Sequence, residues 1–283
     1  MHFTPQLQRL AHAVVAFVTI AVAAAACGNA AAAPNRLQRV LDARELRVCI
    51  WPDYYGITYR NPKTHQLRGI DIDIAAELGK ELGVRIQYVD SSFPLLVDNL
   101  LQDKCDIAMH AIGVTAARSS KLAFTQPHLR SDIYAVTSAS GANIQTWDEI
   151  DKPGRVIAVQ AGTVMEPVMQ ESLKHARLLV VKPPMTRENE VESGRADAFM
   201  TDYPYSRRML DMTRWARVVA PPRPFHLSDY AYALAPGDSS LLDRVDRFIA
   251  AIKSDQRLLR FARNYGLEPV VVTETGRSQS RLR

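Results

Sequence analysis

The sequence is short of several features that would identify common classes of protein. Cysteine occurs only three times, and no two cysteines form a CxxC motif. No run of Lys and Arg and no basic-aromatic stripe is present, which argues against a nucleic-acid surface. GxSxG, HExxH and P-loop motifs are missing, and no spacing predicts a metal site. We therefore expect no cofactor, no metal and no nucleic-acid partner.

The net charge of +5 is spread along the chain among interleaved acids and bases. Such diffuse basicity favours anionic partners or membrane surfaces only weakly. No apolar run after residue 33 is long enough to span a bilayer.

The N-terminus has the pattern of an export signal. A basic start, an apolar stretch over 10–26 and small residues up to Ala33 predict a secretory signal peptide over 1–33. A membrane-spanning helix is disfavoured because the stretch is short and interrupted by alanines. Cleavage after Ala33 would release the protein, whereas cleavage before Cys27 would leave a cysteine for a lipid anchor. We expect a periplasmic or membrane-anchored extracytoplasmic protein.

The other two cysteines lie in apolar, strand-like runs. Cys49 is in "LRVCIW" and Cys105 is in "DKCDIAM". In an exported protein such a pair can be oxidised, so we favour a structural disulfide between neighbouring strands over two separate buried thiols.

The remaining chain alternates strand-like and helix-like patterns, which predicts an α/β fold. In the helix expected over 69–83, Ile74, Leu78 and Leu82 share one face, and Gly83 is placed to end it. The same layout of strand, helix, strand, helix, strand occurs twice, and two helices follow. The expected strands lie at 46–51, 85–90, 105–112, 155–160, 177–182 and 196–202, and the expected helices at 69–83, 93–104, 162–176, 186–195 and 241–266.

Arg118 follows the strand expected over 105–112, at the end where open α/β sheets bind ligands. A guanidinium can hold a carboxylate with two parallel hydrogen bonds, which a lysine ammonium cannot do. Thr115 adds a hydroxyl nearby, and the amide of Gly113 could donate. Because arginine is mostly exposed in proteins, position alone leaves a plain surface role open.

Asp202 ends the last strand of the second half, and its carboxylate suits a ligand ammonium. It could equally cap the helix that follows. Gly162 and Thr163 open another helix, where N–H groups attract an anion, although a plain turn explains them as well. Aromatic residues at or near strand exits could line a pocket or simply pack: Trp51, Tyr54, Tyr55, Phe93 and Tyr203.

His110 and His128 flank the Arg118 segment. Either could shuttle a proton, but we interpret both as partly buried structural residues. With no nucleophile-base motif in the sequence, we expect a protein that is not an enzyme.

Four stretches, in order, are similar to the family 3 (polar amino acid type) periplasmic solute-binding proteins of ABC transporters. The opening 46–83 is similar to theirs, and 105–129 resembles their strand, Thr-x-x-Arg and F-(T/S)-x-P-Y signature. "VQAGTVME" resembles their Gly-Thr turn, and "GRADAFMTD" resembles their strand with a terminal Asp. The order holds from Leu46 to Leu267, which makes the resemblance specific for the family but not for a ligand.

The resemblance implies a type II periplasmic binding protein-like α/β fold with two Rossmann-like lobes joined by a two-segment hinge. We expect lobe 1 over 37–134 and 230–270, lobe 2 over 135–229, and a disordered tail over 271–283. The hinge is expected at about Asp132–Val136 and Ser228–Ala233.

The resemblance also implies that Arg118 binds the carboxylate and Asp202 the ammonium of a small zwitterion, an amino acid, which a monomeric protein delivers to an ABC permease. Thr115 matches the helper hydroxyl, and Tyr54 and Phe93 match aromatic walls. The remaining expected ligand-binding positions are Gly113, Gly162, Thr163, Val164 and Ala111. Gly113 and Val164 stand where hydroxyl residues are frequent, and His128 stands where the signature has Tyr, so the pocket is expected to differ from the usual one.

Two rivals remain open. Cyclohexadienyl dehydratases look similar through "PPRPFHLSDYAYALAP", but Tyr205 stands three residues after Asp202, where that group carries a catalytic Glu. The second rival is a binding protein that serves a periplasmic dehydrogenase or a sensor kinase. A cysteine pair on these two strands resembles that of solute-binding-like proteins associated with quinoprotein dehydrogenases.

Overall fold

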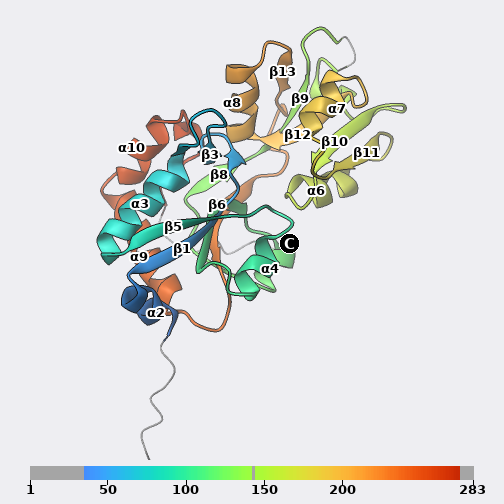
Figure 1. Cartoon of the computed structure of the whole chain (residues 1–283). Helices are drawn as coiled ribbons and strands as arrows, with labels where there is room; N and C mark the ends of the chain where they lie inside the picture. Colours follow the sequence, from blue (N-terminus) through green and yellow to red (C-terminus); the bar gives the residue numbers. More distant parts are fainter. Residues whose placement is uncertain (1–34, 142–143, 275–283) are drawn as a thin grey trace, which may run out of the picture. The chain divides into compact units, whose positions relative to one another are not determined.

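Figure 1 shows the chain as a computed structural model, which describes residues 35–141 and 144–274. The predicted signal peptide over 1–33, the lipidation of Cys27 and the tail from 275 onward lie outside the described residues. In the described part, no helix is long and apolar enough to cross a membrane. That same part holds no cluster of three or more His, Cys, Asp or Glu side chains that could bind a metal ion.

The first sheet has the strand order β5-β1-β6-β14-β7, with β8 paired to β14. β1 is parallel to β5 and β6, whereas β14 is antiparallel to its neighbours. A strand from late in the sequence therefore lies inside a sheet whose other strands come from the first half of the chain. The strands are β1 (Glu45–Ile50), β5 (Arg85–Asp90), β6 (Ile107–Gly113), β7 (Ala123–Phe124), β8 (Leu129–Ser131) and β14 (Ser228–Leu234).

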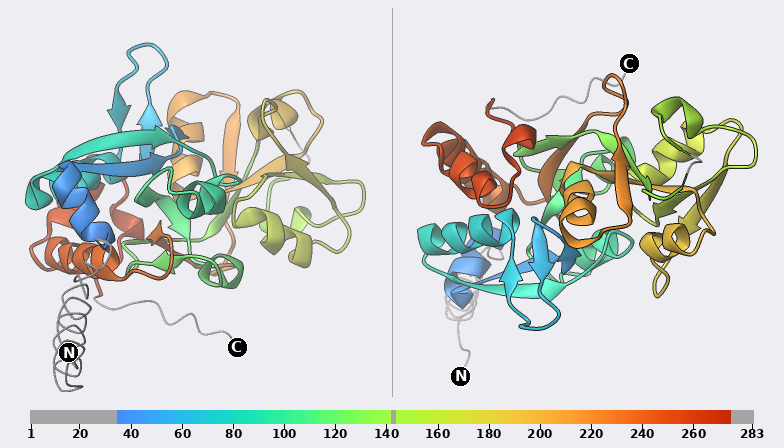
Figure 2. Two further views of the ribbon diagram at one scale, coloured as in Figure 1. Left: turned by 60° about the horizontal axis from the view of Figure 1, so that its bottom comes forward. Right: turned by 90° about the horizontal axis from the view of Figure 1, so that it is seen from above.

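Helices cover this first sheet. The C-terminal helices α9 and α10, orange to red, lie beside α2 and α3 in Figure 1 and in both views of Figure 2. The two C-terminal helices thus pack on helices from the first part of the chain. The helices are α2 (Arg36–Ala43), α3 (Ile70–Leu82), α4 (Leu96–Leu101), α5 (Ala116–Ser119), α9 (Ser240–Ser254) and α10 (Arg257–Arg263).

The second sheet has the order β11-β10-β12-β9-β13, in which β10 is parallel to β11 and β12, and β9 is antiparallel to β12 and β13. Its elements are β9 (Ile133–Ser138), η2 (Trp147–Glu149), β10 (Val156–Gln160), α6 (Met165–Ser172), β11 (Arg177–Val181), α7 (Arg187–Glu192), β12 (Ala198–Asp202), α8 (Tyr203–Met212) and β13 (Ala216–Val219). A small third sheet, next to the first, contains β2 (Asp53–Tyr54), β3 (Thr58–Arg60) and β4 (Leu67–Arg68), and η3 (Glu268–Val270) follows α10.

The chain passes between the two large sheets twice, at Asp132 and again between β13 and β14. Asp132 ties the two passages together, because its carboxylate accepts from the N–H groups of Ile133, Phe225 and His226 at 2.7–2.8 Å. The second passage differs from the hinge expected at 228–233, since those residues lie within β14 of the first sheet. The extended backbone of residues 228–233 is hydrogen-bonded to neighbouring strands of the first sheet and does not connect the two sheets.

The predicted helix over 69–83 illustrates how local sequence sets the elements. α3 buries Ile74 and Leu78, begins after Gly69 and ends at Gly83, which adopts the left-handed conformation. A Cβ on Gly69 would lie 2.1 Å from the carbonyl oxygen of Ile57, so only glycine fits this close approach. The helix thus begins at a close contact between the backbone of Gly69 and that of Ile57.

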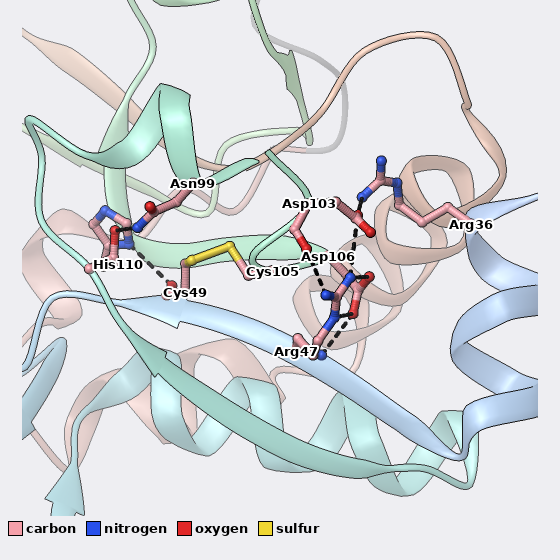
Figure 3. The surroundings of a disulfide bond; sticks show 9 residues. Arg36, Arg47, Cys49, Asn99, Asp103, Cys105, Asp106 and His110 are labelled. Carbon is pink, nitrogen blue, oxygen red and sulfur yellow. Dashed lines mark hydrogen bonds and ion pairs between the residues drawn. A yellow bond between two sulfur atoms is a disulfide. The ribbon is translucent and has the colours of Figure 1, made fainter. Parts of the chain in front are cut away.

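The predicted disulfide is confirmed. Cys49 in β1 is bonded to Cys105, just before β6, and both are buried (Figure 3). Beside it, Arg47 grips the carboxylate of Asp106 with its Nε and Nη2, at 3.1 and 2.8 Å. Together, the covalent bond and the ion pair join β1 to the start of β6.

Residues 271–274, the first part of the tail expected to be disordered, belong to the described part of the chain. Val271 pairs with Leu129, and the Val272 N–H donates to the carbonyl of His128. Val272 is buried, so apolar packing and backbone pairing order these residues although their neighbours in sequence are polar.

Candidate ligand-binding site

A small cavity lies where strand ends from both large sheets meet. This is the position at which open α/β sheets bind ligands. Its walls come from the ends of β1, β5, β6, β10 and β12 and the segments that follow them, together with the start of α7 and the strand β14. The lining residues are Trp51, Tyr54, Phe93, Ala111, Gly113, Thr163, Val164, Met165, Arg187, Thr201, Asp202, Tyr205 and Tyr230.

Arg118 lies beside this cavity on α5 without lining it. Its Nη1 donates to the carbonyl of Gly113 at 2.7 Å, and its Nη2 donates across to the carbonyl of Gly162, in the second half, at 2.8 Å. Burial lowers the pKa of Arg118 to about 10. Within the described residues, no carboxylate forms an ion pair with it. A half-buried cation that is bonded to neutral carbonyls alone is suited to receive an anion.

Other expected carboxylate-binding groups are engaged within the protein. The Thr115 hydroxyl caps α5 by accepting from the N–H of Arg118 at 3.2 Å. The N–H of Gly162 donates to the Glu166 carboxylate at 2.7 Å, and the Thr163 hydroxyl donates to a backbone carbonyl. The helix predicted to open at Gly162 begins at Met165. These groups therefore shape the site through local turns.

Two positions bring the halves close together. A Cβ on Gly113 would lie 2.4 Å from Cγ2 of Val164, and a Cβ on Gly162 would lie 2.8 Å from the Pro94 nitrogen. Ala111 takes a positive φ of 47°, and its N–H donates to the buried Asp71 at 2.8 Å. Glycine at 113 and 162 thus permits contacts between the halves that a Cβ would block.

Asp202 lies at the end of β12 and lines the cavity while almost fully buried. Its Oδ2 accepts from the hydroxyls of Tyr54 and Tyr230, the latter at 2.9 Å, and its Oδ1 accepts from the Tyr205 N–H at 3.1 Å. Burial raises the pKa of Asp202, and the hydrogen bonds from the tyrosines oppose that rise. Asp202 is the N-cap of α8, so the capping alternative holds and the residue faces the cavity as well.

Aromatic rings form much of the wall. Trp51 lies parallel to Tyr205 at 6.2 Å and edge-on to Phe93 at 5.3 Å, with the distances measured between ring centroids. Among the predicted aromatics, Trp51, Tyr54 and Phe93 line the cavity. Tyr55 packs on Tyr59 instead, and Tyr203 packs on Tyr134.

Sequence reasoning missed Arg187, Tyr230 and the position of Tyr205 in the wall. Arg187, at the start of α7, is only 3% exposed. Its guanidinium lies 4.1 Å from the ring centre of Tyr205, donates to the carbonyl of Met200 at 3.1 Å and lies 3.6 Å from the Glu188 carboxylate. The signal was a basic residue in a helix before a buried strand, a pattern shared with many exposed arginines.

Both histidines are buried outside the cavity wall. His128 contacts Asp71 at 3.0 Å, and His110 contacts the carbonyl of Cys49 at 3.3 Å. Burial lowers the pKa of His110 to about 4, so its ring is neutral near pH 7. Their positions agree with the structural interpretation.

Residues 46–268 match the family described as bacterial extracellular solute-binding proteins, family 3. This chain is a member of that family. The resemblance seen in the sequence is thereby confirmed, and the fold is that of type II periplasmic binding proteins.

The proteins that resemble this chain have names that state different activities. Cyclohexadienyl dehydratase of Pseudomonas aeruginosa is 32% identical over 258 residues, which cover 91% of this chain and 94% of the relative. The ABC transporter arginine-binding protein 1 of Escherichia coli (strain K12) is 24% identical over 209 residues, or 72% of this chain and 82% of the relative. The crystal structure of an ancestral amino acid-binding protein, a precursor of cyclohexadienyl dehydratase, has a TM-score of 0.73 at 27% identity and covers 82% of this chain and 99% of its own. Binding proteins and an enzyme both occur among these relatives.

Proposed function

We propose that this family 3 member is an extracytoplasmic solute-binding protein that captures an amino acid in the cavity and delivers it to an ABC permease. The observation that carries the proposal is the placement of two opposite charges at one cavity: a half-buried cation beside it and a buried carboxylate in its wall. Arg118 has no acidic partner among the described residues, and Asp202 faces the cavity from the other half. The protein acts as a monomer in the periplasm, free or lipid-anchored, and needs no cofactor.

At one end, the ligand carboxylate replaces the carbonyl of Gly162 as the partner of Arg118 Nη2. Nη2 and a second guanidinium N–H present the fork that matches a carboxylate. The charge-assisted bonds formed in this way are stronger than the bonds to a neutral carbonyl that they replace.

At the other end, three acceptors surround the place for the ammonium. The Asp202 carboxylate supplies the negative charge. The hydroxyl oxygens of Tyr54 and Tyr230 donate to that carboxylate and can still accept from a ligand N–H. An ammonium has three donors, so this arrangement satisfies it completely.

The ligand enters when the two halves separate. The two halves turn about Asp132 and the passage from 220 to 227, within a few residues of the bounds expected for the lobes, 37–134 with 230–270 and 135–229. The bonds from Arg118 to Gly162 and from Tyr54 to Asp202 run between the halves and must open for this to happen. Ligand binding thus competes with contacts that the protein makes with itself.

A thermal-shift screen of amino acids and related zwitterions tests the proposal. A ligand at a hundred times its Kd stabilises the folded state by about 2.7 kcal/mol and raises the Tm. Arg118→Ala should abolish the shift, while Arg260→Ala, an exposed arginine on α10, should retain it. A complete absence of shifts at millimolar ligand, or normal binding by Arg118→Ala, would refute the proposal.

The dehydratase relative makes an enzyme the second candidate. The 32% identity over 91% of the chain favours it. Tyr205 stands where the catalytic Glu is expected, and burial raises the pKa of this phenol, which makes it a poor proton donor. Incubation with prephenate and with arogenate decides the matter: turnover that copurifies with the protein and is lost in Asp202→Asn would assign the enzyme.

A further inference from the structure

The part of the cavity left for a ligand side chain is walled by rings. Trp51 and Phe93 come from loops of the first half, and Tyr205 comes from α8 of the second. Arg208 holds the Tyr205 ring in place by donating to its hydroxyl at 2.8 Å, and Trp51 lies parallel to it. Because Arg208 and Trp51 hold the Tyr205 ring in place, the ring offers a flat, apolar surface to a ligand side chain.

Charge in the wall is limited to two residues. Among the described residues that line the cavity, Asp202 is the one acid and Arg187 is the one base. Asp202 already accepts three hydrogen bonds and, under the proposed function, receives the ligand ammonium. No acid in this wall is then left to pair with a second positive charge on the ligand.

Arg187 is a fixed cation in this wall. Its guanidinium lies against the faces of Tyr205 and Phe199, at 4.1 and 5.0 Å from their ring centres. Glu188 pairs with it at 3.6 Å but does not line the cavity, so the ligand meets the arginine rather than the acid. A cationic side chain brought into this poorly solvated space would be repelled.

We propose that the site selects amino acids with an uncharged side chain, which packs among Trp51, Phe93 and Tyr205, and that Arg187 is the residue that rejects cationic side chains. This rests on the proposed function and adds a substrate class to it. The arginine-binding relative carries a name that specifies the opposite preference, so this chain differs from it in ligand choice.

Titration calorimetry with norleucine and lysine tests the charge preference, because the two side chains have similar shape and differ in the terminal ammonium. Alanine serves as the reference for the zwitterionic part alone. We expect norleucine to bind at least tenfold more tightly than lysine. Citrulline and arginine give a second matched pair, in which the neutral member should again bind more tightly.

Two variants locate the origin of the preference. Arg187→Met should bring the norleucine-to-lysine affinity ratio towards one, and Glu188→Gln should increase it, because Glu188 offsets part of the charge of Arg187. Glu188→Gln keeps the test decisive if the buried Arg187→Met fails to fold. Arg195→Met is the control, since this exposed arginine after α7 pairs with Glu190 and should leave the ratio unchanged.

The outcomes separate this inference from the proposed function. Lysine binding as tightly as norleucine, in an Arg118-dependent way, would overturn the inference and leave the proposed function standing. An unchanged ratio in both Arg187→Met and Glu188→Gln would remove Arg187 from the explanation. Failure of every zwitterion to bind, alanine included, would overturn both.

Discussion

Two buried aspartates in this protein have nearly the same surroundings and different consequences. Asp71 accepts from the Tyr232 hydroxyl at 2.8 Å, from the Ala111 N–H at 2.8 Å and contacts His128 at 3.0 Å. Asp202 likewise accepts from tyrosine hydroxyls and a backbone N–H. Both lie at the start of a helix, so residue type and local position do not distinguish them.

The difference lies in where the partners come from. The partners of Asp71 all belong to the first sheet or to the loops that connect its strands, and α3 packs on the same sheet. Tyr54 and Tyr230, in contrast, belong to β2 and β14 of the first half and reach Asp202 in the second. Bonds within one packed layer serve stability, whereas bonds between two halves can be exchanged for bonds to a ligand.

The largest expected effect comes from removing Asp71. Asp71→Ala leaves the Tyr232 hydroxyl, the Ala111 N–H and His128 without their buried acceptor, and should lower the free energy of unfolding by about 3 kcal/mol. Urea denaturation measures this loss. Asp73→Ala, in the same turn of α3 and less buried, is the matched control and should cost less than about 1 kcal/mol. Equal losses in the two variants would contradict the assignment of Asp71 to a buried network.

Asp202→Asn should weaken ligand binding by about a hundredfold, because an amide cannot neutralise the ligand ammonium. Calorimetry with a ligand found in the thermal-shift screen gives the measurement. The comparison predicts that Asp71→Asn changes affinity by less than about threefold while it lowers stability. An affinity loss shared by both variants would erase the distinction between them.

The pH dependence of stability should differ between the wild type and Asp202→Asn. Burial raises the pKa of Asp202 above 3.8. The contribution of this carboxyl to the free energy of unfolding is therefore fully present below the ordinary pKa, where it is protonated, and is lost as the pH rises through the raised pKa. The Tm of Asp202→Asn minus that of the wild type should therefore increase from about pH 4 upward. Because this difference cancels the other titrating groups, including His110, a flat difference would show that the pKa of Asp202 is not raised.

The smallest effects come from single hydroxyls. Tyr232→Phe should lower the free energy of unfolding by about 1 kcal/mol without changing affinity, because its bond to Asp71 is internal. Tyr230→Phe should weaken binding by about fivefold, since it removes one acceptor for the ligand ammonium. Denaturation measures the stability of both variants, and calorimetry measures their affinity for the ligand. Equal losses of stability and of affinity in the two variants would contradict the different roles of the two hydroxyls.

Much of the architecture was predictable because it depends on local pattern. The spacing of Ile74 and Leu78 specifies the buried face of α3, and Gly83 marks its end. Alternating strands and helices predict the α/β class, and the bond between Cys49 and Cys105 could be predicted because both lie in strand-like runs of a chain that is expected to be exported. The point at which the chain crosses to the first sheet before β14 was harder to predict. An extended segment that pairs within a sheet and one that connects two sheets have similar sequences.

For the candidate site, the sequence by itself determined the residues that follow strand ends. Arg118, Asp202 and Phe93 could be named because parallel strands bring their carboxyl ends to one edge. Only the tertiary structure decided that Tyr230 reaches Asp202 and that Arg187 faces the cavity. Tyr230 lies in a strand inserted antiparallel beside β6, and Arg187 lies at the start of a helix. Their directions depend on how two sheets pack against each other, and packing across long sequence separations leaves no periodic trace in the chain.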